Sequence, residues 1–170
     1  AADEWRALIT NKYKPLSNKA VAGLYAPGST FKPVVALAAL EKGAITPHTG
    51  ITCGGRMVLG NMRFHCWSRR GHGTLDLRQA LARSCDVYFY ETARRVGVDA
   101  IAEMGHRLGL GHVLGCDLPG ERAGLLPTIK WKSTALRQPW TKGETLITGI
   151  GQGYVLSTPL QLAVMAARIA

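Results

Sequence analysis

The chain has 170 residues, of which 46% are hydrophobic and 19% charged, so it can form one domain, or part of one, with a real core. The formal net charge of +10 would suit a polyanionic partner, but Lys and Arg are scattered, with no run longer than Arg69-Arg70 or Arg94-Arg95. RNP-type aromatics and finger-like Cys/His spacings are missing, so we expect no nucleic-acid binding, whereas attraction to anionic cell-surface material stays open. No apolar stretch approaches the ~20 residues that span a bilayer.

The first strong helical signal follows residue 33. The amino-terminal 25 residues before it offer three possible apolar anchors: Trp5, Leu8 and Ile9. Residues 34–40 are all apolar, and Gly43 stands where a carboxy-terminal cap would fall. Pro33 is tolerated in a first turn, because its missing N–H would have no intrahelical partner there. A turn at 26–28 is therefore expected to enter a buried helix that begins close to Ser29.

The remaining elements are expected to be mainly helical. Residues 46–73 form an irregular hairpin or excursion with a turn at Gly60-Asn61. Thr74 is a good N-cap for a helix over 75–83, and Ser84-Cys85-Asp86 separates it from a helix that ends at Gly97. The last elements in chain order are a helix over 99–108, a long loop region over 111–144, and an apolar helix that Thr158-Pro159 opens and that runs to residue 170.

Two side chains near the start of the first buried helix could form a nucleophile and its base. A serine hydroxyl reacts once a neighbouring base takes its proton, and residues three apart on a helix share a face, with Cβ atoms about 5–6 Å apart. Ser29 and Lys32 have this spacing, and a helix amino terminus aims N–H groups at a developing oxyanion. Lysine is a base only when burial or nearby positive charge keeps it partly neutral, which the apolar helix favours. Ser-x-x-Lys also occurs at solvated helix starts, so its surroundings decide its meaning.

Residues 25–33 read Tyr-Ala-Pro-Gly-Ser-Thr-Phe-Lys-Pro, and over these nine positions the chain resembles the first active-site motif of class B penicillin-binding proteins. Ser84-Cys85-Asp86 resembles their second motif, Ser-x-Asn, in the Ser-x-Asp form of the penicillin-binding protein 2 branch. Further stretches similar to that branch cover nearly the whole chain: 67–73, 109–121, 139–140, 149–154 and 158–161. The third motif of the family, Lys-Thr-Gly or Lys-Ser-Gly, does not occur in the 170 residues.

The resemblance implies a peptidoglycan D,D-transpeptidase. Ser29 would attack the carbonyl between the two terminal D-alanines of a stem peptide while Lys32 accepts its proton; an amine from a neighbouring stem peptide would then resolve the acyl-enzyme into a cross-link. Ser84 would pass a proton between Lys32 and the leaving amine. Asp86 would orient Lys32 or a substrate amide, or would cap the helix that follows it. β-Lactams would acylate Ser29, and catalysis would need no cofactor.

The resemblance also implies an α+β architecture, the penicillin-binding protein and serine β-lactamase fold, in which helices flank an antiparallel sheet. Residues 1–170 would form a partial transpeptidase domain, mainly its helical part with little sheet, without the amino-terminal strands and the Lys-Thr-Gly strand. We therefore expect the chain to be inactive alone. The family further implies the periplasmic face of the bacterial inner membrane, an anchoring segment outside this chain, and a role in cell-wall elongation and cell shape with a membrane-bound glycan polymerase and the elongation machinery.

Three cysteines and one histidine could hold a structural zinc ion: Cys53, Cys66, His72 and Cys85. Closed Cys₃His sites are typical of zinc, and a metal here would brace residues 46–73 against the second motif. The spacing lacks a Cys-x₂-Cys knuckle, so a Cys53–Cys66 disulfide and buried free thiols remain alternatives. His65 is the substitute ligand for His72. Four further residues are left out of the site: Cys116 and the solvated His48, His106 and His112.

Other classes of function stay open beside the enzyme. A penicillin-recognising sensor, or a non-catalytic scaffold that pairs with a cell-wall polymerase, would suit the missing third motif, but Ser29, Lys32 and Ser84 would then have no purpose. A zinc-braced interaction module would leave the Ser-x-x-Lys spacing unexplained.

Overall fold

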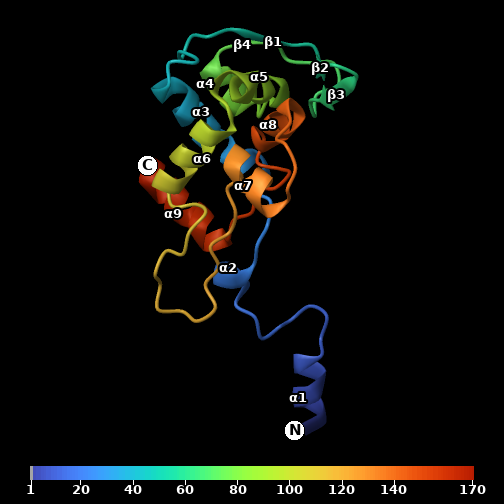
Figure 1. Cartoon of the computed structure of the whole chain (residues 1–170), viewed down its shortest axis with the longest axis vertical. Coiled ribbons are helices and arrows are strands. Elements are labelled where there is room, and N and C mark those ends of the chain that lie inside the picture. The colour runs from blue at the N-terminus through green and yellow to red at the C-terminus, as the bar shows by residue number, and fades with distance from the viewer. Residues whose placement is uncertain (1) are drawn as a thin grey trace.

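The structure is a computed structural model that describes residues 2–170. Helices dominate it, and four short strands form two two-stranded sheets (Figure 1). The elements in chain order are α1 (Ala2–Ile9), α2 (Lys19–Ala22), a 3₁₀ turn η1 (Gly28–Phe31), α3 (Lys32–Glu41), β1 (Ile51–Cys53), β2 (Arg56–Leu59), β3 (Met62–His65), β4 (Gly73–Leu75), α4 (Leu77–Ala82), α5 (Asp86–Val96), α6 (Val98–Arg107), α7 (Ile129–Ala135), α8 (Lys142–Thr148) and α9 (Pro159–Ile169).

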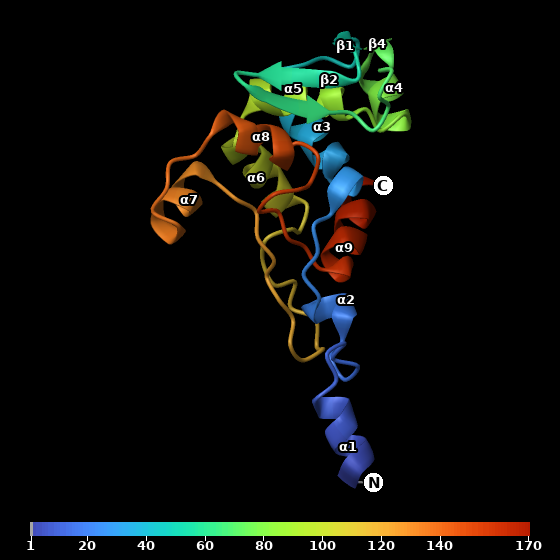
Figure 2. The same cartoon turned by 90° about the vertical axis from the view of Figure 1, so that its right-hand side faces the viewer.

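The hydrophobic core lies around α3 and α5. Helix α3 is apolar on nearly every side because α5 and α6 both pack against it, and α5 also contacts α8 and β1 (Figures 1 and 2). Tyr88 and Phe89 are fully buried between these neighbours, and the Tyr88 hydroxyl donates to the backbone oxygen of Thr49 at 3.0 Å. A buried phenol needs such a partner, so this bond ties the loop before β1 to the core.

The strands cover one side of α5 (Figure 2). Strands β1 and β4 pair antiparallel, with Ile51 opposite Leu75, and β2 and β3 form a hairpin in which Leu59 is opposite Met62. The connection of that hairpin is Gly60-Asn61, as predicted, and Gly60 has a φ of 57° that a two-residue hairpin turn requires. The excursion over 46–73 is therefore a pair of small sheets, and the segment between β3 and β4 returns toward α5.

Several helix boundaries were predicted correctly from local signals. Pro33 lies in the first turn of α3, Gly97 and Gly109 follow the ends of α5 and α6 with positive φ, and Thr158 caps α9. Within residues 2–170, none of the helices combines the length and apolar character needed to cross a bilayer.

Three local predictions were wrong. Thr74 belongs to β4, and the N-cap of α4 is Asp76, which forms a capping box with Gln79. The expected loop over 111–144 contains α7 and the beginning of α8, and each helix is capped by a threonine. The prediction followed the Gly, Pro and Trp content of the region and missed these caps. The third error concerns the three proposed anchors in α1, which are 40–58% exposed because α1 stands away from the body of the molecule (Figures 1 and 2): Trp5, Leu8 and Ile9.

Candidate active site

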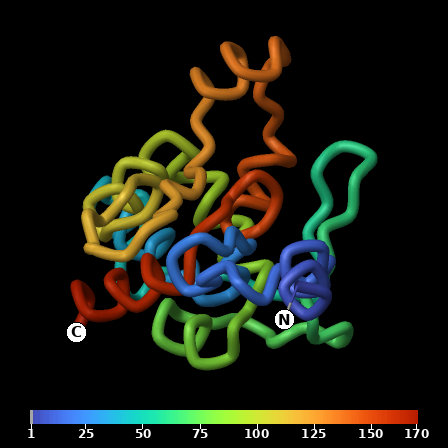
Figure 3. Tube along the Cα trace, turned by 90° about the horizontal axis from the view of Figure 1, so that it is seen from below, coloured from blue at the N-terminus to red at the C-terminus, as the bar shows by residue number. Residues whose placement is uncertain are grey.

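Ser29 lies in the 3₁₀ turn η1 that leads directly into α3. The turn is held by the opposite end of the chain, because the Gly28 N–H donates to Gly151 O at 2.9 Å (Figure 3 shows this segment beside the 150s loop). Gly151 has a φ of 69°, and a Cβ at this position would lie 2.2 Å from Gly28 O. Glycine is therefore required where the 149–154 segment touches the turn that carries Ser29.

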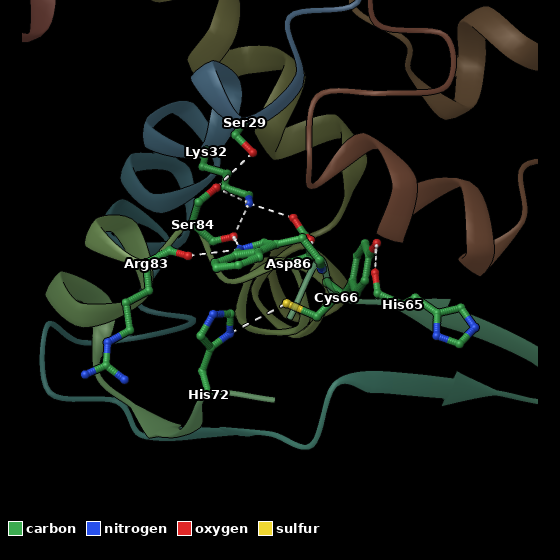
Figure 4. Close-up of polar contacts among 10 residues, drawn as sticks. Ser29, Lys32, His65, Cys66, His72, Arg83, Ser84 and Asp86 are labelled. Carbon is green, nitrogen blue, oxygen red and sulfur yellow. Dashed lines mark hydrogen bonds and ion pairs between the residues drawn. The ribbon is translucent and has the colours of Figure 1, made fainter. Parts of the chain in front are cut away.

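Lys32 is the centre of a polar cluster and is 1% exposed (Figure 4). Its Nζ donates to Asp86 Oδ1 at 2.7 Å, to Ser84 Oγ at 2.9 Å and to Ser84 O at 2.9 Å. Three acceptors thus match the three donors of the ammonium group. Among the described residues, Ser84 also links the lysine to Ser29, since Ser84 Oγ donates to Ser29 Oγ at 2.9 Å. The predicted set of Ser29, Lys32, Ser84 and Asp86 is therefore assembled in one place, with Ser84 between the other serine and the lysine.

The break between α4 and α5 presents Ser84 and Asp86 to this cluster. Ser84 has a φ of 48°, a left-handed conformation that is uncommon for residues other than glycine, asparagine and aspartate. Asp86 is the first residue of α5, whereas Cys85 occupies the N-cap position. The expectation that Asp86 caps this helix is wrong: its carboxylate binds Lys32 and accepts the Trp67 backbone N–H at 3.0 Å.

A cavity of about 600 Å³ opens beside Ser29. Its wall includes residues that sequence reasoning did not assign to the site, from β3, the loop after it, α5 and the 150s loop: His65, Trp67, Arg69, Tyr90, Ile150 and Gln152. Burial, and to a smaller extent the carboxylate of Asp86, raise the pKa of the Tyr90 phenol, so it stays protonated and donates to His65 O at 3.1 Å. The cavity is large enough to admit a peptide end next to the Ser29 hydroxyl.

The four predicted metal ligands lie close together next to the polar cluster, since one of them, Cys85, stands between Ser84 and Asp86 in the chain. The ligand atoms of Cys53, Cys66, His72 and Cys85 all lie within 4.8 Å of one another, and Cys66 Sγ is 3.6 Å from His72 Nδ1 (Figure 4). The pairing of β1 with β4 and the break before α5 bring them together from three segments. The three cysteines of this set, and Cys116 outside it, are free thiols, so the Cys53–Cys66 disulfide expected as one alternative is not formed. The His65 ring points away from this cluster (Figure 4), and His48, His106 and His112 are exposed as expected.

The chemistry of this donor set fits zinc. A tetrahedral ion with Zn–S bonds of about 2.3 Å holds its ligand atoms roughly 3.5–3.8 Å apart. The distance of 3.6 Å between Cys66 Sγ and His72 Nδ1 lies in this range, and every other pair of ligand atoms is within 4.8 Å. Burial, together with the neighbouring thiols of Cys53 and Cys66, raises the pKa of Cys85 to about 12. Without a positive charge nearby, the Cys85 thiol is therefore neutral and unreactive at pH 7, whereas a bound cation would convert it to a thiolate ligand.

The fold agrees with the comparisons to known proteins. Residues 4–170 match the family model described as the penicillin binding protein transpeptidase domain. The chain therefore belongs to this family and has its fold, of which these residues form a mainly helical α+β part. The resemblance noted from the motifs is confirmed.

Individual relatives place the chain near the penicillin-binding protein 2 branch. It is 39% identical over 165 residues to the peptidoglycan D,D-transpeptidase MrdA of Escherichia coli K12, covering 96% of this chain and 26% of that protein. It is 34% identical to the peptidoglycan D,D-transpeptidase PbpA of Mycolicibacterium smegmatis, covering 33% of it. The solved Pseudomonas aeruginosa PBP2 in complex with WCK 5153 has a TM-score of 0.93 and 42% identity over 98% of this chain and 37% of that one. PBP2 from Helicobacter pylori has a TM-score of 0.95 and 38% identity, with 100% and 32% covered. The chain spans about a quarter of the length of MrdA.

Proposed function

We propose that this chain contributes the nucleophile and base of a peptidoglycan D,D-transpeptidase that cross-links stem peptides through an acyl-enzyme on Ser29. The observation that carries the proposal is the hydrogen-bonded series from Ser29 Oγ through Ser84 Oγ to Lys32 Nζ, with both links at 2.9 Å. A serine whose hydroxyl connects through one group to a buried amine can lose its proton as it attacks a carbonyl. The similarity to MrdA and to PBP2 supports the choice of reaction.

In the proposed first step, Lys32 is neutral and the direction of both hydrogen bonds is reversed. The Ser29 hydroxyl proton moves to Ser84 Oγ while the Ser84 proton moves to Lys32 Nζ, as the Ser29 Oγ–C bond forms at the carbonyl between the two D-alanines. Collapse of the tetrahedral intermediate breaks the C–N bond, and the same route returns a proton to the leaving D-alanine amine. Ser84 thus acts in both directions, a wider role than passing a proton to the leaving group alone.

Asp86 has a positioning role in this scheme. One carboxylate oxygen accepts from Lys32 Nζ and the other accepts from the Trp67 backbone N–H. The carboxylate thereby holds the Lys32 amine in place beside Ser84. The second step reverses the chemistry: the amine of a neighbouring stem peptide attacks the acyl carbonyl and forms the new C–N bond, while its proton passes to Lys32. The bond from the carbonyl carbon to Ser29 Oγ then breaks, and Lys32 returns the proton through Ser84 to Ser29 Oγ. A β-lactam would acylate Ser29 by the first step, because its strained amide takes the place of the D-Ala-D-Ala amide.

We further propose that residues 1–170 are a partial domain, which lacks the amino-terminal strands and the Lys-Thr-Gly strand of the complete one. The complete protein would act at the periplasmic face of the inner membrane, held by an anchor outside this chain, in cell elongation together with a membrane-bound glycan polymerase. Solved relatives support these partners: PBP2 from H. pylori is in a complex with MreC, and a relative at 41% identity forms part of a peptidoglycan synthase complex that coordinates polymerization and crosslinking.

The test is mass spectrometry after incubation with a penicillin, on this chain and on the complete domain, each with a Ser29→Ala control. We expect one penicillin adduct on the complete domain, none on its Ser29→Ala variant, and none on residues 1–170 alone. Failure of the folded complete domain to acylate would favour the alternative of a non-catalytic scaffold that pairs with the polymerase. Near-normal acylation of residues 1–170 would contradict the partial-domain proposal.

We also propose that Cys53, Cys66, His72 and Cys85 hold a structural zinc ion, which supplies no step of the chemistry. The support is the tight approach of the four ligand atoms and the burial of the three thiols. Elemental analysis of the purified complete domain should give one zinc per chain. A Cys53→Ser variant should lose it, with Cys116→Ser, outside the cluster, as the matched control; equal zinc in the two variants would contradict the site.

A further inference from the structure

Trp67 makes a set of contacts with the second motif that no other feature of the site explains. Its indole Nε1 donates to Ser84 O and to Arg83 O, both at 3.1 Å, and its backbone N–H donates to Asp86 Oδ2 at 3.0 Å. One residue therefore binds the two carbonyls that flank the Cα of Ser84 and the carboxylate of Asp86, two residues further on (Figure 4 shows this region). Both indole contacts end on backbone carbonyls, which give no pattern in the sequence.

The second motif needs such an external hold. Ser84 has a φ of 48°, and a non-glycine residue in this region costs on the order of 1–3 kcal/mol, so surrounding contacts must maintain it. This conformation aims the Ser84 carbonyl at Lys32 Nζ while the side-chain Oγ lies between Lys32 and Ser29. A relaxation of Ser84 toward ordinary backbone angles would turn the carbonyl and Oγ away together and break the link to Ser29.

Trp67 is well placed to provide the hold, because hydrogen bonds within its loop and a ring contact fix the loop that carries it. Ser68 Oγ donates to Gly71 O at 2.9 Å and the Gly71 N–H donates to Ser68 O at 3.0 Å. The indole ring also packs edge-on against His72, with ring centroids 5.1 Å apart. The Trp67 side chain is nevertheless 65% exposed, so its burial contributes little to stability. The indole N–H donor gives a reason for a large aromatic side chain at such an exposed position.

We infer that Trp67 is a positioning residue for acylation: its indole N–H holds the Arg83–Ser84 peptide so that Ser84 Oγ stays between Lys32 and Ser29, and its backbone N–H orients Asp86 toward Lys32. The inference rests on the proposed acylation of Ser29. It assigns to the indole N–H an effect on the rate of bond formation, whereas the ring itself lines the cavity beside Ser29 and can contact the substrate.

The sharpest perturbation replaces the donor and keeps the ring. In the complete domain, 3-benzothienylalanine at position 67 has sulfur in place of the indole N–H and nearly the same shape. The matched control carries the same replacement at Trp5, which is 58% exposed on α1, a helix without buried residues. Stopped-flow acylation by a chromogenic β-lactam separates the non-covalent dissociation constant from the first-order acylation constant. Thermal unfolding of each protein is measured alongside.

We expect the first-order acylation constant of the position-67 protein to fall about tenfold, the factor that corresponds to loss of one hydrogen bond, with the dissociation constant within twofold of the unmodified value. The Trp5 control should acylate normally. An unchanged acylation constant would overturn the inference, and so would a loss shared by binding, acylation and thermal stability, which would indicate packing alone. If the unmodified domain fails to acylate, the proposed function itself has failed, so the two failures are distinguishable.

Discussion

Substitution of Gly151 by alanine tests how the 150s loop holds the nucleophile. A Cβ at this position would lie 2.2 Å from Gly28 O and 2.6 Å from Phe31 Cβ, and Cβ contacts shorter than 3.0 Å are essentially never seen. The turn that carries Ser29 and the 150s loop must therefore move apart by at least about 0.8 Å, the difference between 2.2 Å and 3.0 Å. Displacements of about 1 Å in a reacting group can reduce rates by roughly 100-fold.

Gly153 provides a matched control, because it has nearly the same backbone conformation without the backbone clash. Its φ is 73°, and the nearest atom to an added Cβ is Ile147 Cγ2, the end of a side chain, at 3.2 Å. Both alanines should pay about 1–2 kcal/mol for the left-handed conformation. Gly151→Ala should lose more, about 3–5 kcal/mol in the free energy of unfolding, because the turn or the loop must also move.

The assay is penicillin acylation of the complete domain, followed by urea unfolding of the same proteins. We expect acylation of Gly151→Ala to be about 100-fold slower than that of Gly153→Ala, at a temperature where both are folded. Equal rates for the two alanine variants would refute the reasoning, because they would show that the contact between Gly151 and Gly28 does not position Ser29.

Three further predictions concern stability in the complete domain. Burial raises the pKa of Glu144, but hydrogen bonds from Lys132 and Thr141 together outweigh this effect and hold the pKa below its ordinary value of 4.5. The stabilisation that these bonds give the folded protein is therefore fully present above pH 4.5 and is lost as the pH falls through the lowered pKa. Glu144→Gln should reduce the free energy of unfolding by about 3 kcal/mol at pH 7, since Lys132 is buried, and should flatten its acid dependence in urea titrations from pH 7 to pH 3; an unchanged acid dependence would contradict this. Thr158→Ala removes the N-cap that accepts the Gln161 N–H and should lower Tm by about 2–4 °C, whereas an unchanged Tm would show that this cap is dispensable. A zinc chelator should lower the Tm of the wild type and leave that of Cys53→Ser unaltered; the same shift in both would argue against the metal.

The predictions that succeeded rest on local geometry. Ser29 and Lys32 are three residues apart, so the start of one helix is sufficient to place them together, and Pro33 and Thr158 mark helix starts through backbone chemistry that needs no partner elsewhere. The capping boxes that define α4 and α8 were also present in the sequence, as Asp76 with Gln79 and Thr141 with Glu144, and could have been recognised.

The cysteine cluster marks an intermediate case. The residue types named a candidate Cys₃His set, but its members come from β1, from the segment between β3 and β4, and from the break before α5. Only strand pairing decides that Cys53 lies opposite Gly73, next to His72. The choice among disulfide, thiol and metal depends on distances that sequence spacing does not contain. The sequence could therefore name the four residues but could not predict how they lie relative to one another.

By itself, the sequence determined the family and identified the proposed nucleophile and base, because short motifs with a fixed helical spacing carry them. The tertiary structure alone decided how Lys32 reaches Ser29, since Ser84 and Asp86 are 52 and 54 residues from Lys32 and meet it only when α5 packs against α3. It alone revealed Trp67, whose partners are backbone carbonyls and a carboxylate oxygen. Every residue has a backbone carbonyl, so no pattern of side chains announces a contact to one; chain packing determines which carbonyl the indole meets.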